Sequence, residues 1–492
     1  MNLNHINVIA RYEVKLVKRS WLFRIFAILA LLFISAIMLG YQTGIVNRMD
    51  NLWPRIAVSS LMPFCNTYFY NIAQSVIVVF LAGSFLKRDK KLDTAEVIYV
   101  RPMSNADYIV GKTWGIVKVF ITLNIITLLF TAFLNILINK SPFDLFPYLF
   151  YLLTISVPSL LFVLGLSFTA MCILKNQAVT FIVMLGIIGT VFFYLTDTLY
   201  GVFDFFGVNI PAIFSDVTGH ADLRLFLLQR FSYLLAGIGL ISMTIALVKR
   251  LPHKPWKIAV VYTFSSLFLL AACLGGLLYI LHYNHQLDLR HQYIMTFDKY
   301  ADVPHVDLLV NDISVTPQGY RLAGKSTVKV ANNNAKPLDK IIFYLNPELT
   351  VTSVEMAGKN LLFRRDHQVI EVDQPIQQQE ELTLTINYEG KISENICYTD
   401  VLTEDYLDTK VPQVFWRFGK RYAWLSNTFT LLTPECIWYP VTIAPVNPGA
   451  PYNVRKNFTD YTLTVFIPVC WGNEAVKELR ECLLSPWTSG IL

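Results

Sequence analysis

Charged residues are scarce in this sequence. Asp, Glu, Lys and Arg account for only 15% of its 492 residues, whereas hydrophobic residues account for 54% and the mean hydropathy is +0.46. Water-soluble globular proteins usually contain about 25% charged residues, so this composition excludes that class and indicates a membrane protein. The apolar excess ends near Tyr283, and the rest of the chain has the mixed composition of a water-soluble domain.

The sequence also lacks the motifs of common enzymes. None of its eight histidines is followed by glutamate, which excludes an H-E-x-x-H zinc site, and no serine or cysteine lies in a recognisable nucleophile motif. His282, His285 and Asp288 are spaced at i, i+3 and i+6, but a solvated helix end explains them better than a metal site does. We therefore expect no catalytic or metal-binding residues, no cofactor and no enzymatic activity.

The seven cysteines contain no C-x-x-C pair, which excludes the usual zinc and redox motifs. Three of them lie in apolar runs, and the other four lie in the water-soluble part of the chain: Cys397, Cys436, Cys470 and Cys482. In an oxidising compartment these four are able to form disulfides, but the sequence does not determine their pairing.

A charged loop, residues 87–112, separates two long apolar runs. Lys and Arg beside membrane spans favour the cytoplasmic side, and the loop is rich in both. Gly111-Lys112-Thr113 is similar to the end of a Walker phosphate loop, but Ala106 occupies the position of the required first glycine and an apolar span follows. We therefore assign no nucleotide binding to it. The net charge of +6 follows from the same positive-inside bias, so no nucleic-acid partner is expected.

Seven apolar stretches are long enough to cross a bilayer: residues 21–41, 68–86, 113–138, 147–174, 178–200, 225–248 and 258–282. They follow a predicted interfacial amphipathic helix, in which Ile9, Tyr12 and Leu16 form one stripe. Counting outward from the charged loop places the N-terminus in the cytoplasm and everything after the seventh span outside. Lys and Arg are concentrated on the segments that this arrangement places inside.

The loop between the fifth and sixth spans is about as long as one more crossing. A re-entrant or interfacial segment is predicted instead of a full crossing, because the loop contains Asp204, Pro211, Asp216 and Asp222. The spans contain no ionisable residue at mid-membrane, and Arg230 is expected near an outer end. A proton- or sodium-driven carrier usually needs such a residue, so any work is expected to be driven from outside the spans.

From about residue 304 the apolar pattern changes to a period of two. Leu382, Leu384, Ile386 and Tyr388 alternate with polar residues, and residues 461–467 repeat the pattern. Further strand-like runs are separated by Gly, Pro and Asn clusters and cover residues 306–315, 320–330, 340–345, 349–356 and 368–372. Short strands with frequent turns predict an all-β sandwich.

The segment TAEVIYVRPMSNADYIVGK, which leads directly into an apolar span, resembles the first cytoplasmic loop of ABC-2 type transporter permeases. With the interfacial helix, the resemblance covers about residues 1–250. In that family the loop forms a coupling helix that docks on a separate ATPase subunit, and six spans form the permease. The resemblance implies ATPase-coupling residues here, namely Thr94, Glu96, Arg101, Pro102, Tyr108, Gly111 and Lys112.

Residues 306–468 resemble the N-terminal β-sandwich of the zinc aminopeptidase family typified by aminopeptidase N. VDLLVNDISVTPQGYRLAGKSTVKVAN, LNPELTVTSVEMAGKNLLF and EELTLTINYEG look like its opening strands in the expected order. In that family the sandwich precedes a catalytic domain with H-E-x-x-H, which this chain lacks. The last stretch does not continue the strand pattern and is interpreted as a truncation or a shifted reading frame.

The expected organisation is an interfacial helix (1–20), a six-span permease-like domain (21–250), a seventh span (251–285), a linker (286–303), an extracytoplasmic β-sandwich (304–468) and an atypical tail (469–492). The resemblances imply the membrane subunit of an ABC-type exporter or importer in the bacterial inner membrane. Its expected partners are a separate ATPase, the lipid bilayer, and a second copy or a paired permease. The alternative is a membrane-anchored scaffold that binds peptides or a partner outside the cell.

Overall fold

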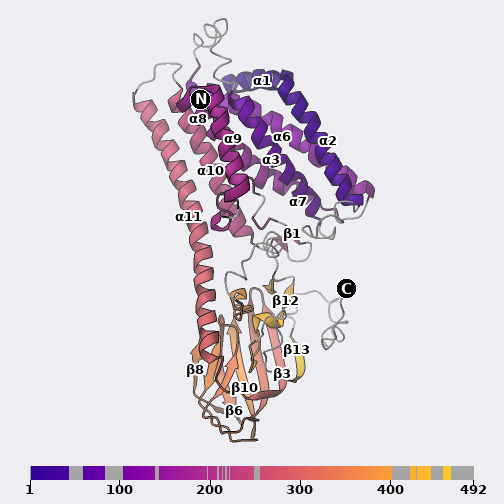
Figure 1. Ribbon diagram of the computed structural model, residues 1–492, viewed down its shortest axis with the longest axis vertical. Coiled ribbons are helices and arrows are strands. Elements are labelled where there is room, and N and C mark those ends of the chain that lie inside the picture. The colour runs from indigo at the N-terminus through magenta and orange to yellow at the C-terminus, as the bar shows by residue number, and fades with distance from the viewer. Residues whose placement is uncertain are drawn as a thin grey trace. The chain divides into compact units, whose positions relative to one another are not determined.

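The computed structural model describes residues 2–43, 59–83, 103–138, 143–196, 198–207, 210–212, 214–215, 219–220, 222–248, 255–401, 421–427, 429–444 and 458–466. The chain divides between Asn284 and His285 into a helical unit and a strand-rich unit. Figure 1 shows the helices of the first and the strands of the second. Each unit has its own apolar core.

The helices are α1 (Leu3–Arg19), α2 (Trp21–Thr43), α3 (Leu61–Gly83), α6 (Asn105–Ile138), α7 (Leu145–Tyr151), α8 (Val157–Leu174), α9 (Gln177–Thr190), α10 (Leu223–Leu247) and α11 (Pro255–Tyr300). A π-helical turn, Leu152–Ser156, joins α7 to α8, and another, Val191–Leu195, extends α9. Seven helical stretches in the described part of the chain are long and apolar enough to cross a membrane, and they coincide with the seven predicted spans.

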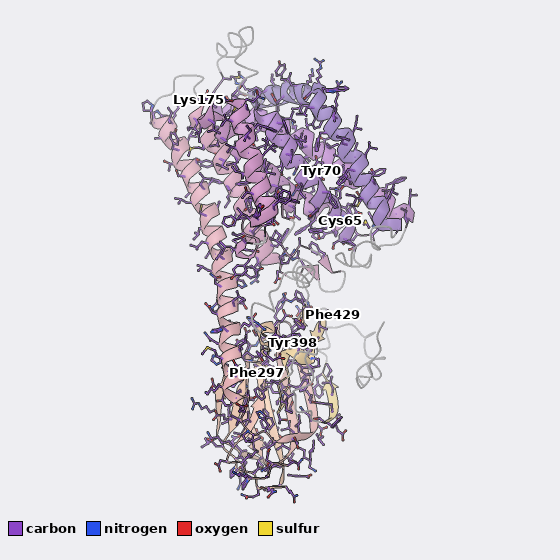
Figure 2. The ribbon with its side chains drawn as sticks, viewed as in Figure 1. Cys65, Tyr70, Lys175, Phe297, Tyr398 and Phe429 are labelled. Carbon is purple, nitrogen blue, oxygen red and sulfur yellow. The ribbon has the colours of Figure 1, made fainter. Side chains whose placement is uncertain are left out.

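Two of these helices begin earlier than the apolar pattern predicts, α3 at Leu61 and α6 at Asn105. The added turns contain polar residues that are buried in the structure instead of marking a loop, namely Asn66 and Thr67 in α3 and Asn105 and Asp107 in α6. α3 is the most enclosed of the seven, with 61% of its apolar stretch buried against 17% for α11. Tyr70, labelled in Figure 2, lies in this core, and its hydroxyl donates to the carbonyl of Phe120 at 2.7 Å.

The amphipathic helix is present as α1, but its buried face differs from the predicted stripe. Tyr12 is 55% exposed, whereas Ile6, Ala10 and Val17 are buried. The fourth buried residue of this face is Glu13, a charged group that the apolar pattern alone assigns to solvent. The face is therefore set by its contact with α6 and not by hydrophobicity alone.

The last helix is longer than predicted. α11 continues to Tyr300, through the stretch expected to be a linker. Tyr293, Phe297 and Tyr300 are spaced at i, i+4 and i+7, which places them on one helix face, and they pack against the apolar residues Ile342 and Tyr344. This packing buries aromatic side chains that a solvated linker would expose, so the segment stays helical.

The strand-rich unit contains a six-stranded and a three-stranded sheet. The larger has the order β13-β3-β4-β10-β6-β7 and the smaller β5-β9-β8, while β11 pairs with β12. Only β13 with β3 is parallel among these described pairs. The strands are β3 (Asp307–Gln318), β4 (Arg321–Ala331), β5 (Ile341–Tyr344), β6 (Leu349–Met356), β7 (Lys359–Asn360), β8 (Phe363–Asp366), β9 (Val369–Val372), β10 (Glu381–Gly390), β11 (Ala423–Leu425), β12 (Thr430–Leu432) and β13 (Asp460–Val465).

One apolar core lies between the two sheets. Leu384 and Ile386 of β10 share it with Phe343 of β5 and Ile370 of β9, and all four are fully buried. The alternation predicted for β10 is thus confirmed. β5 is buried on both faces, since α11 covers the face that turns away from the larger sheet, which explains why its sequence is a continuous apolar run.

Candidate functional site

The predicted ATPase-coupling residues fall into two groups. Four of them, Thr94, Glu96, Arg101 and Pro102, lie outside the described residues. Tyr108, Gly111 and Lys112 lie in the first turns of α6, where their side chains or backbone are buried. The described part of the site is therefore the start of α6 and the surface of α1 that covers it, which we call the α1–α6 seat.

The start of α6 is fixed by hydrogen bonds at its cap. The hydroxyl of Ser104 accepts from the backbone N–H of Asp107 at 3.0 Å, and the carboxylate of Asp107 accepts from the N–H of Ser104 at 3.2 Å. The same carboxylate accepts from the N–H of Asn2 at 2.9 Å. Asn105 donates to the carbonyl of Val248, at the end of α10, at 2.7 Å. The helix start is therefore tied to both α1 and α10.

Two glycines let α1 and α6 approach closely. A Cβ atom on Gly111 would stand 2.8 Å from Cβ of Ile9, and one on Gly115 would stand 2.7 Å from Cβ of Glu13 and 2.9 Å from the carbonyl of Ala10. Real Cβ atoms do not come this close to such neighbours, so these positions require glycine for the observed packing.

An ion pair lies between the same two helices. Nζ of Lys112 is 3.6 Å from Oε2 of Glu13, with side chains only 5% and 2% exposed, and Nζ also lies 5.1 Å from the centroid of the Tyr108 ring. Gly111-Lys112-Thr113 stands within a helix, with its glycine against Ile9 and its lysine paired to Glu13. The tripeptide therefore forms helix-packing contacts and not a phosphate loop.

A second buried polar site involves the segment predicted to be re-entrant or interfacial. In its described residues, Asp204, Phe206, Ile210 and Ala212 are fully buried. Irregular backbone of this kind requires partners for its carbonyl groups when water is excluded. Side chains of the surrounding helices supply them: Ser159 to Phe205 O at 2.6 Å, Asn71 to Phe206 O at 2.7 Å, Tyr151 to Ala212 O at 2.6 Å and Tyr233 to Val202 O at 2.7 Å.

Arg230 of α10 is the charged member of this site and is only 1% exposed. Its guanidinium donates to the carbonyls of Asp204 and Phe205, and its Nε donates to Gln229 Oε1 at 2.5 Å. Gly207, at φ +72°, leaves room for it, since a Cβ there would stand 2.5 Å from Nη1. Sequence reasoning placed Arg230 near an outer helix end and missed its role. Its position beside Gln229, another polar residue in an apolar helix, was the available signal.

A third polar feature lies between α3, α6 and α8, and we call it the polar seam. Its members are buried and uncharged: Asn66, Thr67, Asn71, Gln74, Asn124, Thr127, Thr131, Asn135, Ser156 and Ser159. Thr131 donates to Asn66 at 3.4 Å, and Asn71 donates to Ser159 at 3.1 Å. Asn66 Nδ2, Asn124 Oδ1 and Ser156 Oγ have no hydrogen-bond partner among the described residues. Buried polar groups without a hydrogen-bond partner are uncommon in folded proteins.

The strand-rich unit shows no metal centre in its described residues. No group of three or more His, Cys, Asp and Glu side chains that could hold a metal ion occurs in the described part of the chain. His282, His285 and Asp288 all lie on α11.

No family profile matches the chain, and no curated protein matches its sequence. Among solved structures, it is similar to an M1 zinc metallopeptidase from Deinococcus radiodurans, with 23% identity over 18% of this chain and 21% of that one, at a TM-score of 0.17. A variant of an M1 zinc metallopeptidase from the same organism, bound to a Tyr-Ser-Ala substrate, matches with 19% identity over 33% of each chain, at a TM-score of 0.24. This chain spans a third or less of the length of these structures, and scores this low decide nothing about its function.

Proposed function

We propose that the chain is the membrane-spanning permease subunit of an ABC-type transporter and is driven by a separate ATPase that docks on residues 87–112. The observation that carries the proposal is the α1–α6 seat, in which Glu13 and Lys112 are paired and buried at the end of this loop. Breaking a buried ion pair is costly, so a displacement of the loop moves both helices together instead of being absorbed at a flexible joint.

The coupling residues then have two different roles. The loop residues that precede α6 contact the ATPase, and they are Thr94, Glu96, Arg101 and Pro102. Tyr108, Gly111 and Lys112 are buried in the α1–α6 seat, so in this proposal they transmit the movement of the docked loop to α1. Asn105 extends the same movement to the end of α10 through its bond to Val248.

The polar seam is the part of the helical unit best suited to a polar substrate. It contains no charged side chain, so it offers hydrogen bonds without the strong fixed charge that would retain an ion. This fits a transporter whose energy comes from ATP hydrolysis on the cytoplasmic side. In this proposal the helical unit lies in the bacterial inner membrane and the strand-rich unit lies outside the cytoplasm as a non-catalytic, peptidase-like domain.

The test is co-purification. The tagged full-length chain, extracted in a mild detergent from its own cells, is expected to bring down a protein with an ATP-binding cassette and vanadate-sensitive ATP hydrolysis. An unrelated multi-span membrane protein with the same tag serves as the control. If no ATPase is enriched over this control, the alternative of a membrane-anchored scaffold for peptides or a partner protein replaces the proposal.

Two further measurements test the placement and the absence of catalysis. Reporters fused after His253 are expected in the cytoplasm, and reporters fused after Lys140 and Pro304 outside it. An external signal at His253 contradicts the orientation.

The purified chain with added zinc is expected to release no amine from aminoacyl-anilides, and chelator-sensitive release would show a catalytic site.

A further inference from the structure

We propose that Cys397 and Cys436 form a disulfide bond in the native protein. Their Sγ atoms are 3.3 Å apart, and both residues are fully buried in one small apolar cluster with Ala423. The two cysteines are 39 positions apart in the sequence, so the fold and not the local chain brings them together. Tyr398, next to Cys397, is labelled in Figure 2.

Buried side chains hold both backbone segments that carry these thiols. Asn346 donates through its Nδ2 to the carbonyls of Cys436 at 2.7 Å and Ser393 at 2.9 Å, and its Oδ1 accepts from the N–H of Ser393 at 3.0 Å. One asparagine therefore fixes the spacing between the segment before Cys397 and the segment that ends at Cys436. The thiols face each other because their backbones are positioned independently of them, which is the condition for a bond without large rearrangement.

Arg290 also holds the backbone segment around Cys397, through hydrogen bonds of its own. Its side chain, 1% exposed, donates to four carbonyls, those of Asn395, Cys397, Tyr398 and Val401, at 2.7 to 3.2 Å. Residues 285–300 of α11 belong to the strand-rich unit, so this arginine anchors the helical segment to the loop around Cys397. A disulfide at Cys397 would tie that loop to the segment of Cys436 and so stabilise the anchor of α11.

The reaction is a two-electron oxidation. Each thiol loses a proton, the pair loses two electrons, and one bond forms between the two sulfur atoms. The oxidant is a disulfide, of a thiol oxidoreductase or of a small-molecule thiol, which is reduced to two thiols. Because the folded pair is buried, the exchange takes place while the strand-rich unit is folding.

The inference depends on one part of the proposed function, namely that the strand-rich unit faces an oxidising compartment. The reporter at Pro304 tests that placement separately. An external reporter together with reduced thiols would overturn the disulfide alone, whereas a cytoplasmic reporter would overturn the placement.

The direct test maps thiols in the full-length chain. Intact cells are quenched with acid, and the denatured protein is treated with a first alkylating reagent, which labels free thiols. The protein is then reduced, and a second alkylating reagent labels the thiols released from disulfides. Peptides with Cys397 and Cys436 are expected to carry the second label, and the unreduced digest is expected to contain the two peptides linked to each other. The first label on both cysteines, or linkage of either to Cys470 or Cys482, would overturn the proposal.

A stability measurement tests its consequence. Reductant present while the strand-rich unit is unfolded and refolded is expected to lower its melting temperature in the purified full-length chain by about 10 °C, because the reductant reaches the bond only in the unfolded unit and the bond closes a long loop. In the Cys397→Ser, Cys436→Ser double variant the reductant is expected to have no effect, and Cys273→Ser, on an exposed cysteine of α11, is expected to behave like the parent chain. If the double variant does not fold, the effect of reductant on the parent chain alone tests the disulfide. An unchanged melting temperature of the parent chain would then contradict the proposal.

Discussion

Glu13 and Lys112 form an ion pair between α1 and α6, with Oε2 and Nζ 3.6 Å apart and both side chains almost completely buried. Two charges removed from water in this way stabilise each other, so removal of one is expected to destabilise the other. The pair therefore determines which face of α1 lies on α6, and it places a charged contact directly behind the loop proposed to receive the ATPase.

The first prediction is a double-mutant cycle on this pair. Lys112→Met alone and Glu13→Leu alone are each expected to lower the free energy of unfolding by about 3 kcal/mol, and the two substitutions together are expected to recover most of that loss. The measurement is denaturant unfolding of the purified full-length chain in detergent. Lys118→Met, at an exposed position of the same helix, is the control, and equal losses at both lysines would contradict the account.

The second prediction compares two glycines in membrane-length helices. Gly115→Ala is expected to destabilise the chain by about 2 kcal/mol, because the new methyl group meets Glu13 and the backbone of Ala10. Gly186→Ala in α9, where no atom beyond the adjacent helix backbone lies within 4 Å of the added Cβ, is expected to stabilise the chain by about 0.5 kcal/mol through helix propensity. Thermal melting of both variants checks the expected difference in sign. A gain at Gly115 would show that α1 does not pack on α6 as described.

The third prediction concerns the buried arginine of α10. Arg230→Met is expected to lower the free energy of unfolding by about 3 kcal/mol, since it removes a charged donor from the buried carbonyls of Asp204 and Phe205. It should also make residues 198–212 more susceptible to added protease. Arg224→Met, on the exposed side of the same helix, is expected to change stability by less than about 0.5 kcal/mol. Similar effects of the two substitutions would rule out the assigned role.

The fourth prediction concerns acid. A hydrogen bond from Lys299, with Nζ 2.5 Å from Oδ2, lowers the pKa of Asp366, and one from Tyr300 lowers the pKa of Glu371. A carboxyl group with a lowered pKa in the folded state stabilises the fold above its unfolded pKa, and this contribution is lost as the pH falls through the folded value. The strand-rich unit should therefore lose stability progressively below about pH 4.

The matched comparison uses the pH dependence of thermal melting. The Asp366→Asn, Glu371→Gln double variant is expected to be less stable than the parent chain at pH 7 and to lose less stability on acidification. Glu389→Gln, at an exposed carboxylate, should follow the parent curve. Parallel curves for the parent chain and the double variant would show that these two carboxylates do not contribute to the acid sensitivity.

Local patterns in the sequence predicted most of the elements. Apolar runs located the seven membrane-length helices, and the period of two located β10, because both depend mainly on which side chains must avoid water. The same period also located β13, but the buried face predicted there was wrong, since Tyr461, Leu463 and Val465 are exposed. The extension of α11 to Tyr300 was missed, since its aromatic face is evident only when the sheet against which it packs is known. The same limit applied to α1, whose buried face is set by Glu13 and its partner on another helix.

The candidate sites were less accessible to sequence reasoning. The assignment of Lys112 to the ATPase-coupling loop stays a prediction, and its pairing with Glu13 joins residues far apart in the chain. The tertiary fold also produces two other contacts that the sequence does not reveal. Arg230 donates a hydrogen bond to the carbonyl of Asp204, and the Sγ atoms of Cys397 and Cys436 lie close together. A single sequence contains no signal for such pairings beyond the presence of polar residues where apolar ones are expected.

The most direct test of the central claim is whether the loop of residues 87–112 binds the ATPase. The tagged full-length chain with Glu96→Ala and Arg101→Ala is compared with the parent chain and with a Lys140→Ala control, which lies on the opposite side of the membrane in the proposed orientation. The amount of co-purifying ATPase is expected to fall at least about tenfold, which corresponds to a loss of about 1.4 kcal/mol of binding free energy, while the reporter at Pro304 remains external. Undiminished ATPase binding by the loop variant, or an equal loss in the Lys140→Ala control, would contradict the central claim.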